Sequence, residues 1–180
     1  ARGLAAAAPG GLAPALARLF GIAQSSFESD CSNYRSSGTT ATAAVINAAT
    51  QTVTCAHVGD SSLAVGSAGP RLAFETEDHD FDAGDAARCA ALGGEIREIL
   101  TVMKPVRRLF AKGADYPALA LSRSLGDLEA HAFGVLAEPT VHEAVPFEAG
   151  SWLIAASDGV WNTVSKDMAL QIAASAGSAE

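Results

Sequence analysis

The sequence predicts an α+β fold, a sandwich of antiparallel β-sheet with helices on the outside. The middle of the chain consists of short runs rich in Thr, Val and Ile, separated by turn residues. Amphipathic helical segments precede these runs, interrupt them and follow them. The chain has 180 residues, 49% of them apolar, which is enough for one domain with a hydrophobic core.

Composition and charge exclude several classes of function. The net charge is -8, and the nearest approach to a basic run is the short segment 104–108, so we expect no nucleic-acid partner. No apolar run is long enough to cross a bilayer, so we expect no membrane partner. Cys31, Cys55 and Cys89 are widely spaced and match neither a metal pattern nor a disulfide framework. They predict free thiols in the cytoplasm or another reducing intracellular compartment.

The N-terminal part divides into a loose segment and a helix. Residues 1–11 are rich in Ala, Gly and Pro and are interpreted as a linker or a cut end. A helix is predicted within residues 10–31, because its apolar residues recur on one face at helical spacing. These residues are Leu12, Leu16, Leu19, Phe20, Ala23 and Phe27. The helix is expected to cover a sheet.

Three strands are predicted next, over residues 37–46, 52–58 and 63–65, because these runs are rich in β-formers and the connections between them are short. We interpret them as an antiparallel meander. The second strand ends at Gly59-Asp60, where a carboxylate follows a glycine. Gly, Asp and Ser are all common turn residues, so a simple tight turn is one interpretation of this site.

An acidic segment, residues 75–85, contains His79 and allows two interpretations. It could coordinate a metal, but a solvated loop leading into a helix is the favoured interpretation. Asp82 is a suitable N-cap with Asp85 in the first turn, and Gly93 provides a left-handed C-cap. A helix is therefore expected between the Asp82 cap and Gly93, with residues 86–92 as good helix formers.

The rest of the chain is expected to return to strands. Residues 95–100 predict a strand, 101–117 a long loop with two prolines, and 118–122 a short buried strand. Residues 123–127 are expected to form a turn in which Arg123 and Asp127 could form an internal, structural ion pair. An edge strand is predicted over residues 140–145, after Pro139.

The C-terminal part contains a run of apolar residues, 152–156, that ends in Ser157-Asp158-Gly159. The absence of polar alternation predicts a strand buried on both faces. A final helix is predicted after the N-cap Ser165, with Met168, Ala169, Ile172 and Ala173 on one face. Asp60 and Asp158 each follow a strand beside a glycine and could converge on one cation, which prefers oxygen ligands. An Asp-Gly turn is the simpler alternative for Asp158.

Taken together, the motifs resemble the metal-dependent Ser/Thr protein phosphatases of the 2C type, over roughly residues 12–175. Each motif is weak singly, but their order and spacing match the family. The motifs are Ser37-Gly38-Thr39-Thr40-Ala41, Val58-Gly59-Asp60-Ser61, Asp78-His79, Arg88 with Gly93-Gly94, Leu121-Ser122-Arg123-Ser124-Leu125-Gly126-Asp127, Ala137-Glu138-Pro139 and Ala156-Ser157-Asp158-Gly159-Val160-Trp161. Residues 12–180 are accordingly interpreted as a partial phosphatase 2C-like domain.

The resemblance implies an α-β-β-α sandwich and an enzyme that holds two Mg²⁺ or Mn²⁺ ions. A bridging water would attack a phosphoserine or phosphothreonine of a phosphoprotein substrate, so the family is a hydrolase. Asp158 matches the family's metal-ligating aspartate, and Asp60 matches one linked in some members with a third, weaker ion. Asp78, His79, Arg123 and Asp127 match positions that we interpret as structural.

The chain also departs from the family pattern. The Asp-Gly-His-Gly-type metal motif, the early Glu-Asp pair with the phosphate-binding Arg, and the late Asp-Asn motif do not occur in it, and Asn162 stands where many members have Asp. The sandwich is therefore expected to be incomplete, and the chain alone is not expected to be active. Two hypotheses remain. The chain belongs to a longer phosphatase, or it is a catalytically inactive module that binds a protein partner in an assembly.

Overall fold

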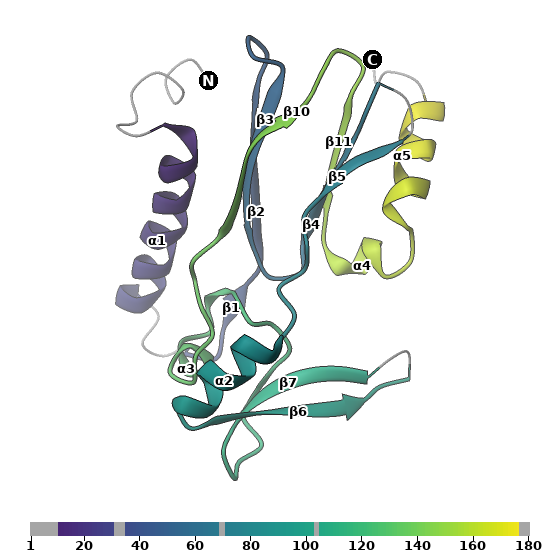
Figure 1. Cartoon of the computed structure of the whole chain (residues 1–180). Helices are drawn as coiled ribbons and strands as arrows, with labels where there is room; N and C mark the ends of the chain where they lie inside the picture. The colour runs from purple at the N-terminus through teal and green to yellow at the C-terminus, as the bar shows by residue number, and fades with distance from the viewer. Residues whose placement is uncertain (1–10, 31–34, 69–70, 103–104, 177–180) are drawn as a thin grey trace.

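Two three-stranded antiparallel sheets pack face to face, with a helix on the outer side of each (Figure 1). The computed structural model describes residues 11–30, 35–68, 71–102 and 105–176. Helix α1 (Leu12–Asp30) covers one sheet and α5 (Lys166–Ser175) the other. This arrangement confirms the predicted α+β class and the α-β-β-α order. Residues 1–10 of the predicted linker lie outside the described residues.

The first sheet lies against α1. Its strand order is β10-β3-β2, with bounds β2 Ala41–Asn47, β3 Thr52–Val58 and β10 Thr140–Pro146. Leu16 and Phe20 of α1 are buried against Ala56 and Val58 of β3. The predicted helix and the edge strand β10 are confirmed. Leu19 is the exception on the predicted helical face, because its side chain is 50% exposed.

The second sheet lies against α5. Its strand order is β11-β4-β5, with bounds β4 Ser62–Gly66, β5 Leu72–Glu75 and β11 Trp152–Ala156. Ser165 caps α5 as predicted, since its hydroxyl accepts from the Met168 N–H at 3.2 Å. The predicted apolar face is wrong: Met168 and Ile172 are more than half exposed, and Leu170 is the buried contact. Leu170 lies over Gly66, whose missing side chain leaves room for it.

The predicted strand over residues 152–156 is confirmed as β11 (Trp152–Ala156), but its predicted burial on both faces is wrong. β11 is an edge strand of its sheet, and its residues are only partly buried or exposed. Its unbroken apolar run gave no indication of which strands would flank it. No described helix is long and apolar enough to cross a membrane.

Successive side chains of β3 point alternately to the two faces of its sheet and enter two different clusters. Val53 and Cys55 point to the second sheet, where they pack with Leu63 and Val65 of β4. The intervening Ala56 and Val58 point to α1. Cys55 and Cys89 are buried free thiols, as predicted, and Cys31 lies outside the described residues.

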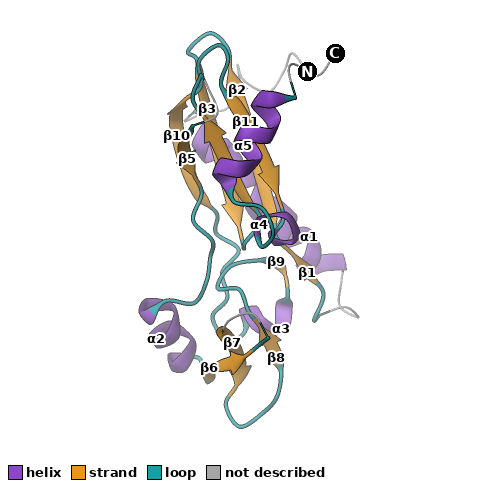
Figure 2. Cartoon of the chain, turned by 90° about the vertical axis from the view of Figure 1, so that its right-hand side faces the viewer, coloured by secondary structure: helices purple, strands orange, loops and turns teal. Residues whose placement is uncertain are grey.

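A smaller unit lies below the sandwich and is called the lower module here (Figure 2). It comprises α2 (Ala83–Ala91), β6 (Gly94–Leu100), β7 (Pro105–Ala111), β8 (Pro117–Leu119) and α3 (Leu128–His131). Phe81, Cys89 and Leu109 centre its own hydrophobic core. Helix α2 begins with the predicted Asp82 cap, reinforced by Asp85 in a capping box. It is followed by Gly93 at φ +82°, as a left-handed C-cap requires.

The lower module contradicts three expectations. The predicted loop 101–117 contains β7, which pairs with β6 along its whole length. The predicted strand 118–122 is reduced to β8, which ends at Leu119. The predicted Arg123–Asp127 ion pair is absent, because Arg123 Nη1 donates to the Glu138 carbonyl at 2.8 Å. The Asp127 carboxylate instead lies over Gly38, where β1 (Gly38–Thr39) pairs with β9 (Leu125–Gly126).

The predicted meander is also wrong, and its correction explains how the fold places the site. β3 pairs with β2 and β10, whereas the next strand, β4, pairs with β5 and β11. The segment Gly59-Asp60-Ser61 is therefore a crossover turn between the two sheets. Gly59 has φ +86°, and a Cβ atom there would overlap the Thr40 side chain. A glycine is required at this position both for its backbone conformation and for space.

Hydrogen bonds from the loop after β5 and from the residue before β2 hold the crossover turn. The Gly59 N–H donates to His79 Nδ1 at 3.0 Å, and the His79 N–H donates to the Gly59 carbonyl at 3.1 Å. Thr40 Oγ1 lies 2.7 Å from Ser61 Oγ. Because His79 Nδ1 accepts, its Nε2 carries the proton and donates to Thr140 Oγ1 at 2.8 Å. Burial, followed by the charges of His57 and Arg123, lowers the pKa of His79 to about 4.

We predict that Gly59→Ala destabilises the protein by about 2–4 kcal/mol, because the new methyl group meets Thr40 and φ stays positive. Chemical denaturation measures the change. The matched control is Gly21→Ala in α1, where a Cβ atom meets nothing within 4 Å. Ala in a helix interior should raise stability by roughly 0.5–1 kcal/mol. A Gly59→Ala protein as stable as wild type would contradict the role given to this turn.

Stability is predicted to fall as the pH drops from about 6.5 to about 4. The pKa of His79 is lower in the folded protein than the 6.5 of the unfolded chain, so the unfolded chain binds the proton first as the pH falls. The contribution of neutral His79 to the free energy of unfolding is therefore complete only above pH 6.5. The loss should be about 2 kcal/mol, discounted because the ring is partly exposed. Urea denaturation across this range, on wild type and His79→Asn, isolates the contribution. An equal pH slope in both proteins would refute it.

Candidate functional site

The two predicted metal ligands, Asp60 and Asp158, lie at the same end of the second sheet. In the antiparallel pairing of β11 with β4, Ala156 lies opposite Ser62. Asp60 precedes Ser62 by two residues and Asp158 follows Ala156 by two, so the register brings both carboxylates to one edge. Asp158 is the first residue of the short helix α4 (Asp158–Trp161), next to the crossover turn (Figure 1).

The carboxylates around Asp60 repel one another. Burial is the largest cause that raises the pKa of the half-buried Asp60, and the charge of Asp158 is the next. Asp78 and Asp80 raise it further. Neighbouring carboxylates repel one another, and a cation bound between them would offset that repulsion. Asp158 itself is exposed, and its Oδ2 accepts from Asn162 Nδ2 at 3.2 Å.

Trp161 fixes the relative position of the two strand ends that carry these aspartates. Its indole Nε1 donates to the Ala156 carbonyl at 2.8 Å and to the Ser62 carbonyl at 3.1 Å. Lys166 lies over the same ring, with Nζ 5.9 Å from its centroid, and pairs with Glu75 at 2.7 Å. The ends of β4 and β11 are therefore held together by side-chain contacts as well as by the sheet.

The acidic segment 75–85 has structural partners. Ser62 Oγ donates to Asp78 Oδ1 at 3.0 Å, and both ring nitrogens of His79 are engaged. Within the described ranges, no group of three or more His, Cys, Asp or Glu residues is placed to hold a metal ion. These contacts agree with the favoured interpretation, a loop leading into α2. They also agree with the structural role expected for Asp78 and His79.

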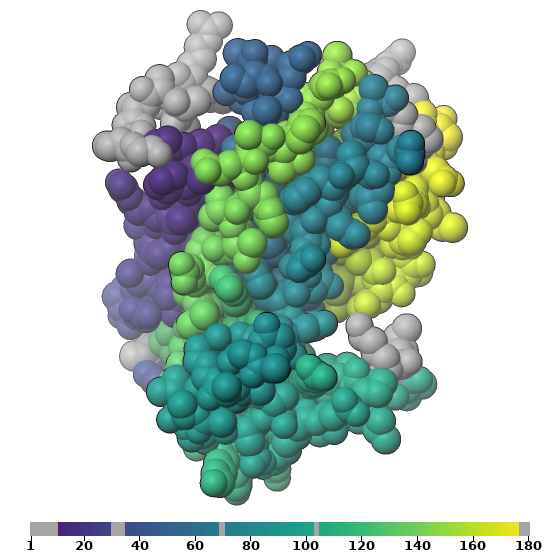
Figure 3. All heavy atoms as spheres, viewed as in Figure 1, coloured from purple at the N-terminus to yellow at the C-terminus, as the bar shows by residue number. Residues whose placement is uncertain are grey.

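Two cavities lie beside Asp158 and the acidic segment, and Asp60 lines neither of them. One, of about 350 Å³, is lined by Asp158, Asn162 and Lys166 and is called the Asp158 pocket. The other, of about 590 Å³, lies between the sandwich and the lower module and is called the acidic cleft. Glu75 and Asp78 line both cavities, so the two adjoin at these residues. In the space-filling view, the lower module packs directly beneath the strands of the sandwich (Figure 3).

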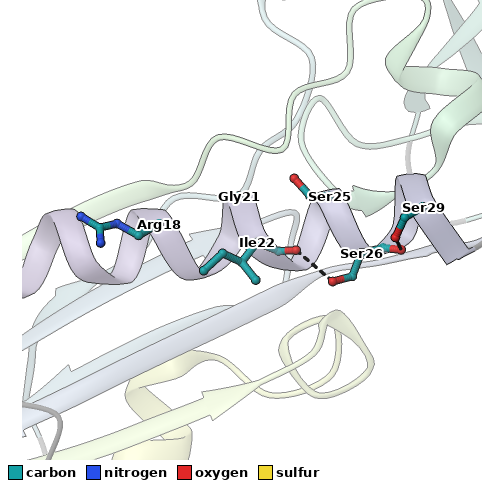
Figure 4. Close-up of a pocket in the computed structure, with 6 residues that line it drawn as sticks. All are labelled: Arg18, Gly21, Ile22, Ser25, Ser26 and Ser29. Atoms are coloured by element: carbon teal, nitrogen blue, oxygen red, sulfur yellow. Dashed lines mark hydrogen bonds between the residues drawn. The ribbon is translucent and has the colours of Figure 1, made fainter.

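A third cavity, of about 540 Å³, lies along helix α1 and has a different character. It is lined by Arg18, Gly21, Ile22 and three serines, with no carboxylate (Figure 4). Ser26 Oγ in this group donates to the Ile22 carbonyl one turn earlier in the same helix. It is a shallow surface of one helix, on the other side of the sandwich from Asp158 (Figure 1).

Sequence reasoning missed several side chains of this region. Ser62 and Lys166 were not expected to contact the site, and the Trp161 indole was known only as part of a motif. His57 was taken for an ordinary strand residue, yet its ring stacks 4.4 Å from that of His79 and 6.1 Å from that of His142. Alternation along the strand places His57 on the same face as Val53 and Cys55. That pattern could have predicted that His57 faces the interior between the sheets.

Sequence comparisons identify relatives of the chain. The family described as protein phosphatase 2C matches residues 16–179. Probable protein phosphatase 2C 3 of Oryza sativa subsp. japonica is 34% identical over 142 residues, which cover 75% of this chain and 27% of that protein. Probable protein phosphatase 2C 15 of Arabidopsis thaliana is 34% identical, over 74% of this chain and 30% of its own length. The chain thus spans less than a third of these relatives.

Solved structures share the fold. Serine-threonine phosphatase 2C from Toxoplasma gondii superposes with a TM-score of 0.76 and 24% identity, over 92% of this chain and 56% of that one. A C. elegans sex determining protein superposes with a TM-score of 0.63 and 21% identity, over 89% of this chain and 36% of that one. With the same order of layers and a family match over nearly its whole length, the chain belongs to the protein phosphatase 2C family.

Proposed function

We propose that the chain is part of a longer enzyme that uses Mg²⁺ or Mn²⁺ to hydrolyse phosphoserine and phosphothreonine in proteins. The observation that carries the proposal is the convergence of Asp60 and Asp158 at one sheet edge, set by the pairing of β4 with β11. Family membership supports it, because the matched relatives are named as probable protein phosphatases. The partners implied are phosphoprotein substrates.

The side chains present fit a cation. Burial and then the charge of Asp158 raise the pKa of Asp60, so the two carboxylates lie close enough to interact. Carboxylate oxygens are the ligands that Mg²⁺ and Mn²⁺ prefer. Two carboxylates are too few for the two ions of a complete family member, so we expect further ligands from other parts of the parent protein. Asp158 would be the firm ligand and Asp60 the auxiliary one.

When bound, the ions would lower the pKa of a water and offset charge on the phosphoryl oxygens. Asp158 and Asp60 of this chain would hold them, together with ligands from the rest of the parent protein. The crossover turn fixes the backbone of Asp60, and Trp161 holds the strand end that carries Asp158 to the start of β4. The serine hydroxyl of Ser62 orients Asp78 beside them.

The two described cysteines are poor candidates for a nucleophile. Burial raises the pKa of the Cys55 and Cys89 thiols, and a protonated, inaccessible thiol does not attack phosphorus. Their state supports water as the nucleophile. The cytoplasm or another reducing intracellular compartment, expected from the sequence, stays a prediction.

The alternative proposal is an inactive phosphatase-like module that binds a protein partner in an assembly. One observation favours it: the neutral amide of Asn162 donates to Asp158 Oδ2, an oxygen that would otherwise face a cation. A neutral ligand in place of a carboxylate weakens a cation site. Metal affinity and phosphate release by the parent protein separate the two proposals.

We predict that the parent protein with Mn²⁺ releases phosphate from a phosphothreonine peptide, and that Asp158→Asn lowers kcat/KM about 100-fold, the order expected for one lost electrostatic contact to the transition state. The control is Glu148→Gln, an exposed carboxylate outside the cavities described above. Full activity in Asp158→Asn would refute the ligand assignment. No phosphate release from the wild-type parent protein would favour the inactive module.

A second prediction concerns Asn162. Asn162→Asp should lower the Kd for Mn²⁺ about tenfold, because a charged ligand replaces an amide beside Asp158. Isothermal titration calorimetry measures the affinity without any turnover. Asn162→Ala, which removes the amide without adding charge, serves as the control and should change the Kd much less. An unchanged or weaker affinity in Asn162→Asp would show that position 162 does not face the cation.

A further inference from the structure

The acidic cleft has walls from both parts of the fold. The sandwich contributes His57 of β3, Phe74 of β5 and Thr140 of β10, and the lower module contributes Asp85 of α2 and Arg107 of β7. With a volume of about 590 Å³, the cleft is large enough for a long side chain. The chemistry of its walls decides which side chain it suits.

Negative charge dominates the walls. Six carboxylates line the cleft against two guanidinium groups, those of Arg107 and Arg123. Both arginines donate to backbone carbonyls, Arg107 to Phe81 at 2.9 Å and Arg123 to Glu138 at 2.8 Å. The carboxylates are Glu75, Glu77, Asp78, Asp80, Asp82 and Asp85.

Most of these carboxylates have partners in the fold, and two do not. Asp85 pairs with Arg88 at 2.6 Å, and Glu75 pairs with Lys166 at 2.7 Å. Within the described part of the chain, the side chains of Glu77 and Asp80 form no ion pair or hydrogen bond. Both are exposed. They are therefore available to a cationic ligand.

His57 provides a second, independent indication. Its side chain lines the cleft, the residue is 1% exposed, and its Nδ1 has no hydrogen-bond partner. The other ring nitrogen, Nε2, lies 2.8 Å from the Glu77 carbonyl. A carbonyl can only accept, so Nε2 carries the proton and Nδ1 of the neutral ring is a bare lone pair. A buried acceptor without a donor is costly, and no described residue donates to this atom.

We propose that the acidic cleft binds an arginine or lysine side chain of the phosphoprotein substrate, close in sequence to the phosphorylated residue. The proposal rests on the proposed function. The cleft shares Glu75 and Asp78 with the Asp158 pocket, so a peptide with its phosphate at Asp158 can extend into the cleft. Guanidinium and ammonium groups provide positive charge for the unpaired carboxylates of Glu77 and Asp80 and an N–H donor for Nδ1 of His57.

The test uses the parent protein and pairs of phosphothreonine peptides that differ only in arginine or its neutral isostere citrulline. The residue is moved through positions -4 to +4. At the preferred position, the arginine peptide should have a kcat/KM about tenfold above that of the citrulline peptide, the order expected for electrostatic recognition. The preference should decrease at high salt, because exposed charges are screened.

Variants then locate the preference in the cleft. Glu77→Gln should lower the arginine-to-citrulline ratio about threefold, and Glu77→Gln with Asp80→Asn should bring it close to 1. Asp80 also acts on Asp60, which affects both peptides equally, so the ratio isolates recognition. Glu148→Gln is the matched control and should leave the ratio unchanged. Both replaced residues are exposed, so folding is not at risk.

A binding measurement separates this proposal from the proposed function. Addition of an unphosphorylated arginine peptide should shift the ¹⁵N resonance of His57 Nδ1, as an N–H group donates to it, and the citrulline peptide should not. Binding without any phosphate release would leave the subsite standing and overturn the phosphatase proposal. Phosphate release with equal kcat/KM for both peptides and no shift at His57 would overturn the subsite alone.

Discussion

The crossover turn between β3 and β4 is the constraint on which the remaining arrangement depends. Gly59 allows the chain to leave one sheet and enter the other, and the paired hydrogen bonds with His79 fix that step to the loop after β5. Thr140 of β10 holds the far side of the His79 ring. One turn thereby connects both sheets and the loop that leads to the lower module, and Asp60 lies at its centre.

This placement has an energetic cost. The turn and the β4–β11 register bring Asp60, Asp78 and Asp158 together. Burial raises the pKa of Asp60 most, and repulsion from Asp158 and Asp78 raises it further. A fold selected for stability alone would separate such groups. The hydrogen bonds of Trp161 and Ser62 offset the repulsion by holding the strand ends in place. Charge concentrated at a rigid edge is typical of a site built for a cation rather than for stability.

Local patterns predicted most individual elements of the fold but not their partners. The Asp82 cap, the Gly93 stop and the apolar face of α1 are short-range signals, and each is confirmed. The Gly59-Asp60 turn looked like a hairpin turn, because a crossover between sheets uses the same residue types as a turn within one. β7 was missed because Pro105 and the arginines of its strand resemble a solvated loop. The convergence of Asp60 and Asp158 follows from register, which a single sequence does not encode locally.

The same long-range register explains why the acidic segment 75–85 could not be interpreted from the sequence. Its composition predicts a solvated loop, and the capping box of α2 agrees with that. Its contacts, however, are with residues distant in sequence: Asp78 with Ser62, His79 with Gly59, and the Glu77 carbonyl with His57. These contacts turn a polar loop into the common wall of the Asp158 pocket and the acidic cleft. Because one segment both anchors the crossover turn and lines the cleft, charge recognised in the cleft lies next to the carboxylates that would hold the metal.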